Sequence, residues 1–463
     1  MKKYDVVIIG AGSGGLSARR EVAKKTDNYL VVDGGVLGTT CARVGCMPSK
    51  VLIQVAQDFN RRHKFSEQGI HGHESLEVNT KEVMLHVRKL RDRFVRGVLG
   101  GMQDWKETHF KSAIAEFVNP HTLRIGEETI QADKIIVATG SKPNLPPPLE
   151  GCEEFCVNTD QFFELEDLPK RWAVLGLGVI GLELGQSLHR LGLEVTGIAR
   201  RQNIAGITDP ELNTYVIKKF SEEMNLTFNG LKGARKSSSG LVLDLGDREI
   251  EVDKVLVTAG RYPCWDSVRG EVLGFKGQVP DHDPHTFQLV DHEHIFIAGD
   301  NTGEYQILHE ASDEGKIAGF NAVNPLTKFR RRTPLMITFS DPNIAFSGKT
   351  YKELIDLKID FAIGEVSFEG QGRSIVKLKE NGLLRVYGDK KSGKLIGAEM
   401  MGPSCEHIAH LLSWVIDQDL TVNQVLALPF YHPVIEEGLR TALRDLRDKV
   451  EEPSPVLEIF PCD

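Results

Sequence analysis

The chain has few of the features that mark secreted, membrane or nucleic-acid-binding proteins. Its seven cysteines are an odd number, and five are scattered without the spacing of a disulfide framework: Cys152, Cys156, Cys264, Cys405 and Cys462. Such usage is typical of a reducing compartment, where a close cysteine pair is more often catalytic or metal-binding than structural. No apolar run approaches the roughly 20 residues that span a bilayer. We therefore expect a cytoplasmic protein without a membrane partner.

Acidic residues outnumber basic ones, with 65 Asp and Glu against 56 Lys and Arg. The formal net charge is -9, which argues against nucleic acid or an anionic membrane as the main partner. The hydrophobic share of 41% and the charged share of 26% are ordinary for a globular protein. At 463 residues, the chain is long enough for about three domains.

Short apolar runs that end in glycine recur along the first two thirds of the chain. They are residues 4–9, 135–138, 172–175, 255–259 and 294–298. Such runs are typical of buried strands in a parallel sheet. Helical patterns lie between them, as at residues 81–99 and 180–191. This alternation predicts doubly wound α/β domains.

The pattern changes after the basic residues 328–332. Four segments there read as antiparallel strands, with helices following: residues 361–368, 373–380, 382–387 and 394–400. We expect a C-terminal domain of α+β type beside two Rossmann-like domains. The proline-rich residues 141–148 indicate the end of the first domain segment.

A glycine fingerprint follows the first apolar run and opens a helix. Its glycines are Gly10, Gly12 and Gly15, and Asp33 closes the next apolar stretch. Glycines at this spacing let the backbone approach a pyrophosphate on the helix N-terminus, and the acid binds a ribose hydroxyl. The alternative is a tight strand-to-helix turn without a ligand.

A second copy of this fingerprint follows residues 172–175, with Gly176, Gly178 and Gly181. Here Ala199 stands where an acid would bind the ribose, and Arg200 and Arg201 follow. Losing a carboxylate and gaining cations favours a 2′-phosphate, so we predict NADP over NAD. The alternative is that both arginines lie on a solvated loop.

A cysteine pair lies in GTTCARVGCMPSK, residues 38–50. Cys41 and Cys46 are too far apart in a regular helix to be bridged, because five residues rise about 7.5 Å and bridged Cα atoms lie about 4.4–6.8 Å apart. Gly45 is placed to let the segment deviate. A helix that starts near Pro48 would lower a thiolate pKa. The alternatives are a zinc half-site, for which no second pair at matching spacing is evident, or inert thiols.

These motifs together resemble the flavin-dependent pyridine nucleotide–disulfide oxidoreductases of class I, and the Pro-Ser-Lys ending is most similar to dihydrolipoamide dehydrogenases. The resemblance covers essentially the whole chain. It includes both fingerprints and several further motifs: Thr139-Gly140, Thr258-Ala-Gly260-Arg261, Gly299-Asp300, His309 to Gly315 and His432-Pro433. The implied domains are an FAD-binding domain of residues 1–150 and 271–333, an NAD(P)-binding domain of residues 151–270, and a dimerisation domain of residues 334–463.

The resemblance also implies roles for individual residues. Cys46 would face the flavin, and Cys41 would exchange with a disulfide substrate. Lys50 would lie by the flavin N5, paired with Glu183. Asp300 would bind the ribityl chain, with Thr139, Gly140 and Gly260 in the neighbouring cofactor-binding turns. His432 and Glu437 would form a general acid–base pair that acts on the other subunit's thiols of a homodimer.

The active-site loop departs from the family pattern at Thr39, Ala42 and Arg43, and Val434 follows His432-Pro433. Arg43 either tunes the thiols, selects an anionic substrate or points to solvent. We expect Cys462 to be idle.

The leading hypothesis is an FAD-dependent dithiol/disulfide oxidoreductase acting on a lipoamide-like compound, with a lipoyl-bearing 2-oxoacid dehydrogenase complex as a further partner. The alternatives are an NAD(P) transhydrogenase or quinone-type diaphorase, an NADPH-dependent reductase of glutathione-reductase type, and a non-catalytic partner in a complex.

Overall fold

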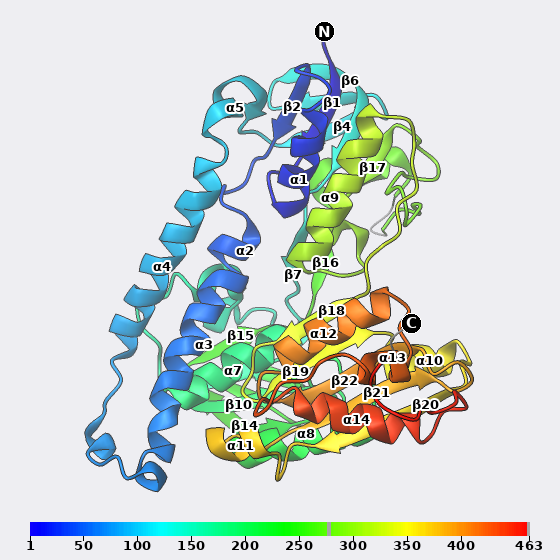
Figure 1. The fold of residues 1–463 in the computed structure, drawn as a ribbon. Coiled ribbons are helices and arrows are strands. Elements are labelled where there is room, and N and C mark those ends of the chain that lie inside the picture. Colours follow the sequence, from blue (N-terminus) through cyan, green and yellow to red (C-terminus); the bar gives the residue numbers. More distant parts are fainter. Residues whose placement is uncertain (276–278, 461–463) are drawn as a thin grey trace.

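The computed structural model describes residues 1–275 and 279–460, so Cys462 lies outside the described part. The N-terminal unit is a sheet with helices against it (Figure 1). Its parallel strands are β1 (Lys2–Ile9), β2 (Tyr29–Val32), β3 (Phe110–Lys111), β6 (Glu128–Val137) and β17 (Ile295–Ile297). An antiparallel hairpin, β4 (Ala115–Asn119) and β5 (Thr122–Ile125), joins the same sheet through β6. Buried Val and Ile side chains along β1 explain why this strand lies inside the sheet.

Two helices from distant parts of the chain pack together on this unit. They are α1 (Ser13–Val22) and α9 (Leu308–Val323). Their axes approach closely because Gly315 and Gly319 leave no side chain between them: a Cβ there would lie 2.2 Å from the oxygen of Gly14 and 2.4 Å from that of Ala18. The N-terminal unit is thus completed by β17 and α9, which come from residues after 290.

The second unit repeats the parallel arrangement. Its sheet has the order β11-β10-β9-β15-β8, from strands Asn225–Thr227, Glu194–Ile198, Arg171–Leu175, Lys254–Val257 and Cys156–Val157. The short α6 (Thr159–Phe162) follows β8, and α7 (Val179–Arg190) and α8 (Pro210–Glu223) pack on the sheet. A separate antiparallel sheet follows, formed by β12 (Gly233–Lys236), β13 (Leu241–Asp244) and β14 (Glu249–Val252). Two strands, β7 (Ser141–Pro143) and β16 (Arg261–Pro263), pair where the chain leaves and re-enters the N-terminal unit.

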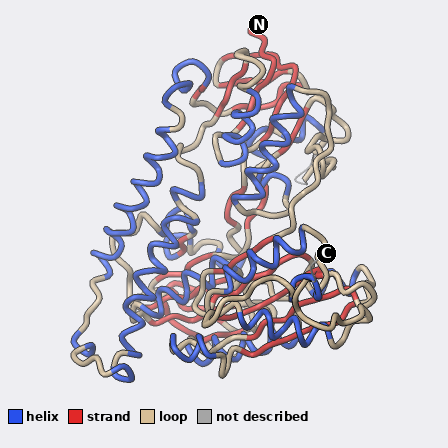
Figure 2. Tube along the Cα trace, in the orientation of Figure 1, coloured by secondary structure: helices blue, strands red, loops and turns tan. Residues whose placement is uncertain are grey.

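Long helices connect the first unit to the second. The thiol loop contains α2 (Thr40–Arg43) and continues into α3 (Cys46–Asn60), which lies beside α4 (Thr80–Gly100) before the short α5 (Gln103–His109). Figure 2 shows these helices running along one side of the molecule. Leu52 and Ala56 of α3 enter the same core cluster as Trp172 and Leu184 of the second unit. Packing therefore fixes the thiol loop relative to both units.

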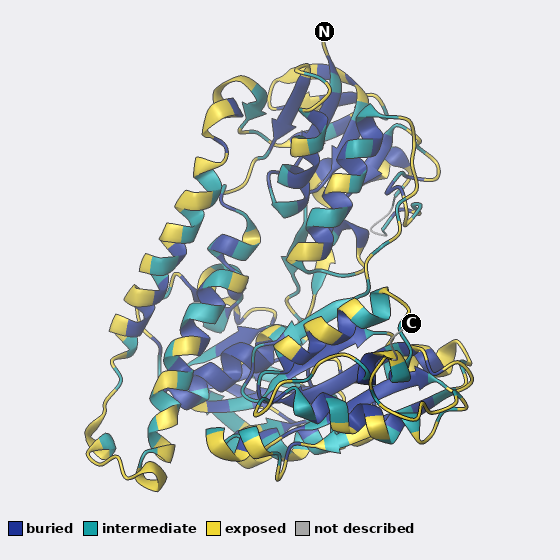
Figure 3. Cartoon of the chain, in the orientation of Figure 1, coloured by how far each residue is buried: buried dark blue, intermediate teal, exposed yellow. Residues whose placement is uncertain are grey.

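The C-terminal unit is an antiparallel sheet with helices on it. Its order is β18-β19-β22-β21-β20, from Leu335–Thr338, Asn343–Gly348, Leu395–Gly402, Leu383–Asp389 and Phe361–Ser367. The helices are α10 (Tyr351–Asp356), α11 (Gly372–Lys377), α12 (Cys405–Asp417), α13 (Val422–Leu426) and α14 (Glu437–Arg447). Figure 3 shows the strands buried beneath helices whose outer faces are exposed. The fold class of two Rossmann-like units plus an α+β unit is confirmed.

One predicted strand is wrong. Residues 373–380 fall on α11 and the turn after it, where the alternating pattern predicts a strand. Gln371 caps this helix by accepting the Ser374 N–H at 2.8 Å, and Leu378 ends it with a φ of +55°. A side-chain cap of this kind starts a helix irrespective of the periodicity that follows it. The strand order along the chain is otherwise as expected for the other three segments.

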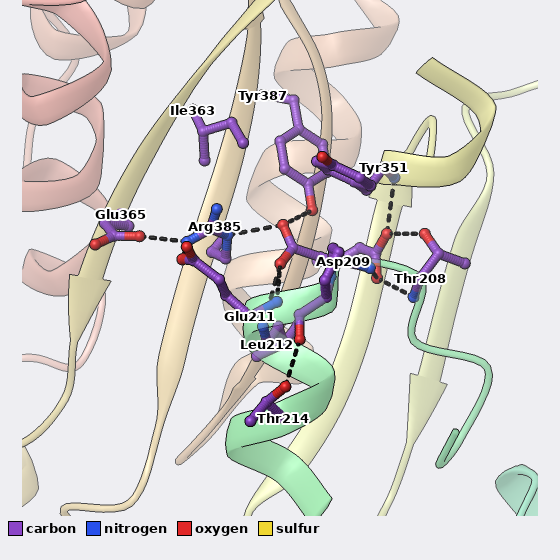
Figure 4. A network of polar contacts seen from close by, with 12 residues as sticks. Thr208, Asp209, Glu211, Leu212, Thr214, Tyr351, Ile363, Glu365, Arg385 and Tyr387 are labelled. Carbon is purple, nitrogen blue, oxygen red and sulfur yellow. Dashed lines mark hydrogen bonds and ion pairs between the residues drawn. The ribbon is translucent and has the colours of Figure 1, made fainter. Parts of the chain in front are cut away.

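A buried polar network fastens the second unit to the C-terminal sheet (Figure 4). Asp209, fully buried, caps α8 and accepts hydrogen bonds from Arg385 Nε at 2.7 Å and from the Tyr387 hydroxyl at 3.0 Å. Glu399 of β22, also fully buried, accepts the N–H groups of Thr208 at 2.7 Å and Tyr351 at 2.8 Å. Removing one partner from such a network costs about 3–5 kcal/mol, because it leaves a buried charge without compensation.

Candidate active site

The first glycine turn has the geometry of a phosphate cradle. Gly10 has a φ of +110°, and a Cβ there would lie 2.2 Å from the Ala138 oxygen. A Cβ on Gly15 would lie 1.8 Å from the Gly10 oxygen. Gly12, by contrast, has nothing within 4 Å of its Cβ position. The turn is therefore packed tightly on its protein side and open on the side that faces the start of α1.

Charge at this turn also suits an anion. The first turn of α1 holds no acidic residue, so the positive end of the helix dipole is not neutralised. Asp33 follows β2, and its carboxylate accepts the Ala11 N–H at 2.7 Å and the Gly35 N–H at 2.7 Å. The carboxylate thus lies directly beside the fingerprint, at the position expected for an acid that binds a ribose.

The turn after β17 brings several predicted residues together. Asp300 accepts a hydrogen bond from Ser141, and Ser141 accepts one from Arg261 Nε at 2.8 Å. The Thr139 hydroxyl lies 3.0 Å from the Asn301 side chain, and Gly140 has a φ of +71°. Residues from three separate segments of the chain therefore meet at the carboxyl ends of β6 and β17.

The thiol loop deviates from regular helix as its sequence predicts. It consists of α2 (Thr40–Arg43), a break at Val44 and Gly45, and α3, which begins at Cys46. Thr39 caps the first helix by accepting the Ala42 N–H, and it does so at a φ of +62°. Cys41 and Cys46 are both free thiols, half-buried and exposed respectively.

The two thiols have opposite acidities. The Cys41 thiol donates a hydrogen bond to Cys46, and this donation together with burial raises the pKa of Cys41 well above its ordinary value. Accepting that bond, with help from the charge of Lys50, lowers the pKa of Cys46 to about 7 although burial opposes it. Cys46 is therefore the more acidic of the two thiols, and it is the one that ionises near neutral pH.

Lys50 and Glu183 form an ion pair between α3 and α7. Lys50 Nζ lies 2.8 Å from Glu183 Oε2, and the Glu183 side chain is 3% exposed. The other oxygen of Glu183 accepts the Phe339 N–H at 2.8 Å. The pair thus joins the thiol helix, the second unit and the C-terminal unit one turn along α3 from Cys46.

The second glycine turn repeats the first. Gly176 has a φ of +104°, and a Cβ on Gly181 would lie 1.8 Å from the Gly176 oxygen. Gly178 has nothing within 4 Å of its Cβ position, and the first turn of α7 has no acidic residue. The neighbouring Gly260 has a φ of +97°. These are the features of a second dinucleotide cradle.

Two arginines follow β10 at the place where the first unit has Asp33. Arg200 and Arg201 are both exposed. Among the residues that the structure describes, neither side chain makes an ion pair or a hydrogen bond. Both guanidinium groups are therefore available to an anion beside the second turn.

His432 and Glu437 also lie together. His432 Nδ1 is 2.9 Å from Glu437 Oε1, and the other carboxylate oxygen accepts the Val434 N–H at 3.1 Å. Hydrogen bonding to His432 is the main cause that lowers the pKa of Glu437. The His432 side chain is 80% exposed. No hydrogen bond or ion pair within the described part of the chain joins His432 to either thiol.

Arg331, which belongs to none of the sequence motifs described above, supports the turn at Gly299 through Glu314. Glu314 of α9 accepts the Gly299 N–H at 2.8 Å and an Arg331 hydrogen bond at 2.8 Å. Burial raises the pKa of Glu314 to about 8, and the Arg331 charge opposes this shift. The basic run at residues 328–332 is the only sign of this contact in the sequence.

Two family models together cover most of the chain. Residues 4–315 match "Pyridine nucleotide-disulphide oxidoreductase", and residues 335–443 match the dimerisation domain of the same family. The chain belongs to the pyridine nucleotide-disulphide oxidoreductases. A member of this family uses FAD and a pyridine nucleotide, and the open sides of Gly12 and Gly178 fit two dinucleotides.

Curated relatives of this oxidoreductase are similar over nearly their full length. A dihydrolipoyl dehydrogenase from Thermus scotoductus is 29% identical, with 96% of this chain and 98% of the relative covered. One from Haloferax volcanii is 27% identical, with 95% of each covered. A mercuric reductase from Lysinibacillus sphaericus is also 27% identical, with 95% of this chain and 82% of the relative covered.

Solved structures share the fold. LpdA from Mycobacterium tuberculosis aligns with a TM-score of 0.82 at 20% identity, covering 96% of this chain and 99% of that one. The HOCl-induced flavoprotein disulfide reductase RclA from Escherichia coli aligns with a TM-score of 0.81 at 20% identity. The alignment covers 97% of this chain and 100% of that one. At this identity the likeness concerns the fold alone.

Two further features bear on the sequence predictions. Within residues 1–275 and 279–460, no helix is long and apolar enough to cross a membrane. The same residues hold no group of three or more His, Cys, Asp or Glu side chains that could bind a metal ion.

Proposed function

We propose that this oxidoreductase is a dihydrolipoamide dehydrogenase-like enzyme, which passes electrons between a small dithiol or disulfide and a nicotinamide cofactor. The observation that carries the proposal is the thiol pair on either side of the break between α2 and α3, in which Cys46 is the more acidic thiol. The names of several relatives, which are dihydrolipoyl dehydrogenases, support the substrate class.

The two cysteines divide the exchange chemistry between them. In the oxidised enzyme Cys41 and Cys46 are bridged, and a substrate thiolate attacks Cys41 Sγ. The bridge breaks, Cys46 leaves as a thiolate, and Cys41 becomes part of a mixed disulfide. The second substrate thiol then attacks the mixed disulfide and displaces Cys41. The substrate is now an oxidised disulfide, and both cysteines are reduced. A leaving thiolate of low pKa, as at Cys46, makes the first step fast.

The cofactor would be held by the residues of the first turn, namely Gly10, Gly12, Gly15, Asp33 and Asp300, with Thr139 and Gly140 beside them. FAD, when bound, supplies the two-electron acceptor that reoxidises the thiols and exchanges hydride with the nicotinamide. Lys50 would keep a positive charge beside Cys46, and Glu183 holds Lys50 in place at 2.8 Å.

His432 would take the proton of the substrate dithiol. Glu437 orients the ring through Nδ1, which leaves Nε2 to face the substrate and stabilises the charged imidazolium. The exposed position of His432, apart from the thiols of its own chain, supports its action on the second subunit of a homodimer. A lipoyl-bearing complex would bring its substrate to the thiol pair and to His432 of the second subunit.

The second turn would bind the nicotinamide cofactor through Gly176, Gly178, Gly181 and Gly260. Arg200 and Arg201 favour the 2′-phosphate of NADP because no acid competes for the ribose there. This observation also favours a second candidate, an NADPH-dependent disulfide reductase of glutathione-reductase type. The two candidates share the thiol chemistry and differ in the physiological disulfide.

Replacement of Cys41 by Ser tests the proposal. We expect the Cys41→Ser enzyme to keep its flavin and to lose at least about a thousandfold in lipoamide turnover, because the interchange thiol is the nucleophile. Dye reduction by the nicotinamide cofactor is the matched control, since it bypasses the thiols. Lipoamide turnover retained by this variant would refute the role of Cys41 and would favour a transhydrogenase or diaphorase.

A turnover panel separates the remaining candidates. NADH and NADPH are each combined with lipoamide, glutathione disulfide and a quinone. The proposal expects lipoamide to be the best disulfide. Glutathione disulfide as the best substrate with NADPH would favour the second candidate.

A further inference from the structure

Arg331 lies in the connection between α9 and β18, and its guanidinium group reaches back to three carboxylates of the N-terminal unit. Nη2 donates to Glu310 at 2.7 Å and to Glu314 at 2.8 Å, and Nη1 donates to Glu304. The Arg331 side chain is 19% exposed, whereas Glu310 and Glu314 are buried. A largely buried cation that binds acceptors from two segments constrains them more than a surface ion pair does.

Two of these contacts hold opposite ends of the turn that carries Asp300. At the first end, Glu314 accepts the Gly299 N–H at 2.8 Å through the oxygen that Arg331 does not use. At the other end, Glu304 is bound by Arg331 directly. Asp300, between these ends, is the residue expected to bind the ribityl chain of FAD. Arg331 therefore clamps both ends of the cofactor-binding turn.

The charge of Arg331 also decides how well Glu314 can hold its end of the turn. Both oxygens of Glu314 accept hydrogen bonds, an arrangement that suits the ionised carboxylate. Burial raises the pKa of Glu314 to about 8, while the Arg331 charge lowers it. Without Arg331 the carboxyl group would therefore be neutral over a wider pH range. A neutral acid accepts a hydrogen bond less strongly than a carboxylate, so the Gly299 N–H would be held less firmly.

The guanidinium group of Arg331 also lies beside two aromatic rings and at the wall of a cavity. Its Cζ is 5.2 Å from the centre of the Phe287 ring and 5.8 Å from that of the Tyr305 ring. The cavity opens to solvent, has a volume of about 440 Å³, and is also lined by Glu310 and Glu314. A small cation could therefore reach these carboxylates from solvent if the arginine side chain were removed.

We infer that Arg331 is a positioning residue for FAD, which fixes the turn around Asp300 in its cofactor-binding conformation by holding the two ends of that turn. The turn then needs little further ordering when the flavin binds, and local opening of the turn, which would release the flavin, becomes rarer. Arg331 thereby sets how firmly FAD is kept. This role goes beyond the proposed function, because it is the same whichever disulfide the enzyme reduces.

The test is the rate of FAD release from the purified holoenzyme, followed by the fluorescence of free flavin after dilution. Arg331→Ala should release FAD at least about tenfold faster than the parent, because removing one partner leaves buried carboxylates without compensation. The matched control is Arg332→Ala, which removes a cation from the wall of the same cavity. Arg332 is 76% exposed and pairs with Asp313 at the surface, so its loss should leave the rate within about twofold.

Chemical rescue separates the action of the guanidinium group from a general loss of stability. Methylguanidinium added to Arg331→Ala should enter the cavity, pair with the carboxylates and slow FAD release by at least about threefold. Tetramethylammonium at the same concentration should have no such effect, because it cannot donate a hydrogen bond. Neither cation should change the rate of the parent or of Arg332→Ala.

FAD release from Arg331→Ala at the rate of Arg332→Ala would overturn the inference. Equal effects of the two cations on Arg331→Ala would also overturn it, since the lost side chain would then act through packing alone. If Arg331→Ala cannot be purified, Glu304→Gln decides, because Glu304 is 38% exposed and the amide keeps an acceptor oxygen. This variant should speed FAD release by about threefold, and an unchanged rate would overturn the clamp. None of these measurements uses a disulfide substrate, so failure here is distinct from failure of the thiol chemistry.

Discussion

The two glycine turns have similar backbone conformations, but different residues follow the next strand of each unit. In both, the first glycine has a φ above +100° and the third excludes any side chain, while the middle glycine borders open space. Beyond the turn they diverge. The first unit ends its second strand in Asp33, which is fixed by two backbone N–H groups. The second ends in Ala199, followed by two exposed arginines without partners in the described residues.

From this difference we expect the turn to set where a pyrophosphate binds, and the residues after the next strand to set which nucleotide is accepted. A carboxylate that already accepts two N–H groups is fixed in place and rejects a phosphate. Two free guanidinium groups attract one. The following variants sharpen or break this comparison, and they are ordered by the size of the expected effect.

The middle glycines give the largest effects. Gly12→Ala should abolish FAD binding, and Gly178→Ala should keep FAD but lower kcat/KM for the nicotinamide by at least about a hundredfold. Each new methyl enters space that is open in the protein alone. The Gly12→Ala chain should therefore melt at the same Tm as the flavin-free parent. Flavin absorbance per chain and differential scanning calorimetry measure both. A yellow Gly12→Ala protein would contradict the comparison.

Asp33→Ala should weaken FAD binding by about tenfold to a hundredfold. The change removes the acceptor of two N–H groups as well as the expected ribose contact, and an unpaired buried donor costs about 1–3 kcal/mol. Equilibrium dialysis of the flavin measures the loss. The Asp33→Asn variant keeps an acceptor oxygen and should recover part of the affinity, whereas equal losses in both would exclude hydrogen bonding as the cause.

Arg200→Ala should lower kcat/KM for NADPH by about tenfold, because a hydrogen bond to a charged group contributes about 1.5–3 kcal/mol. The value for NADH should stay within about twofold, and Arg201→Ala serves as the parallel test of the second guanidinium. Steady-state kinetics with both nucleotides provides the ratio. Equal losses with NADH and NADPH would mean that neither arginine reads the 2′-phosphate.

The smallest effect concerns the thiols that follow the first turn and have no counterpart after the second. In the reduced enzyme, alkylation of Cys46 should increase as pH rises through about 7. Cys41→Ala removes the donated hydrogen bond that stabilises the thiolate, so the pKa of Cys46 should rise by about one unit. Alkylation rates measured against pH provide both values. An unchanged midpoint would show that Cys41 does not polarise Cys46.

The two glycine turns and the helix break at Gly45 could be predicted from the sequence, because each depends on the spacing of residues within one short segment. The meeting of Lys50 with Glu183 could be expected only from the family resemblance, since the two lie on different units. The helix α11 and the β12–β14 sheet could not be predicted. The first depends on a single capping residue and the second on pairing between strands that carry weak patterns. The contact of Arg331 with Glu314 likewise joins distant segments.

The buried network around Asp209 and Glu399 has a mechanical consequence. It joins the second unit to the sheet of the C-terminal unit, and each carboxylate keeps all of its hydrogen bonds only while the two units remain in contact. These two parts should therefore melt in one cooperative step. The N-terminal unit is joined to these two parts by the paired strands β7 and β16 and by the packing of α3 on the second unit.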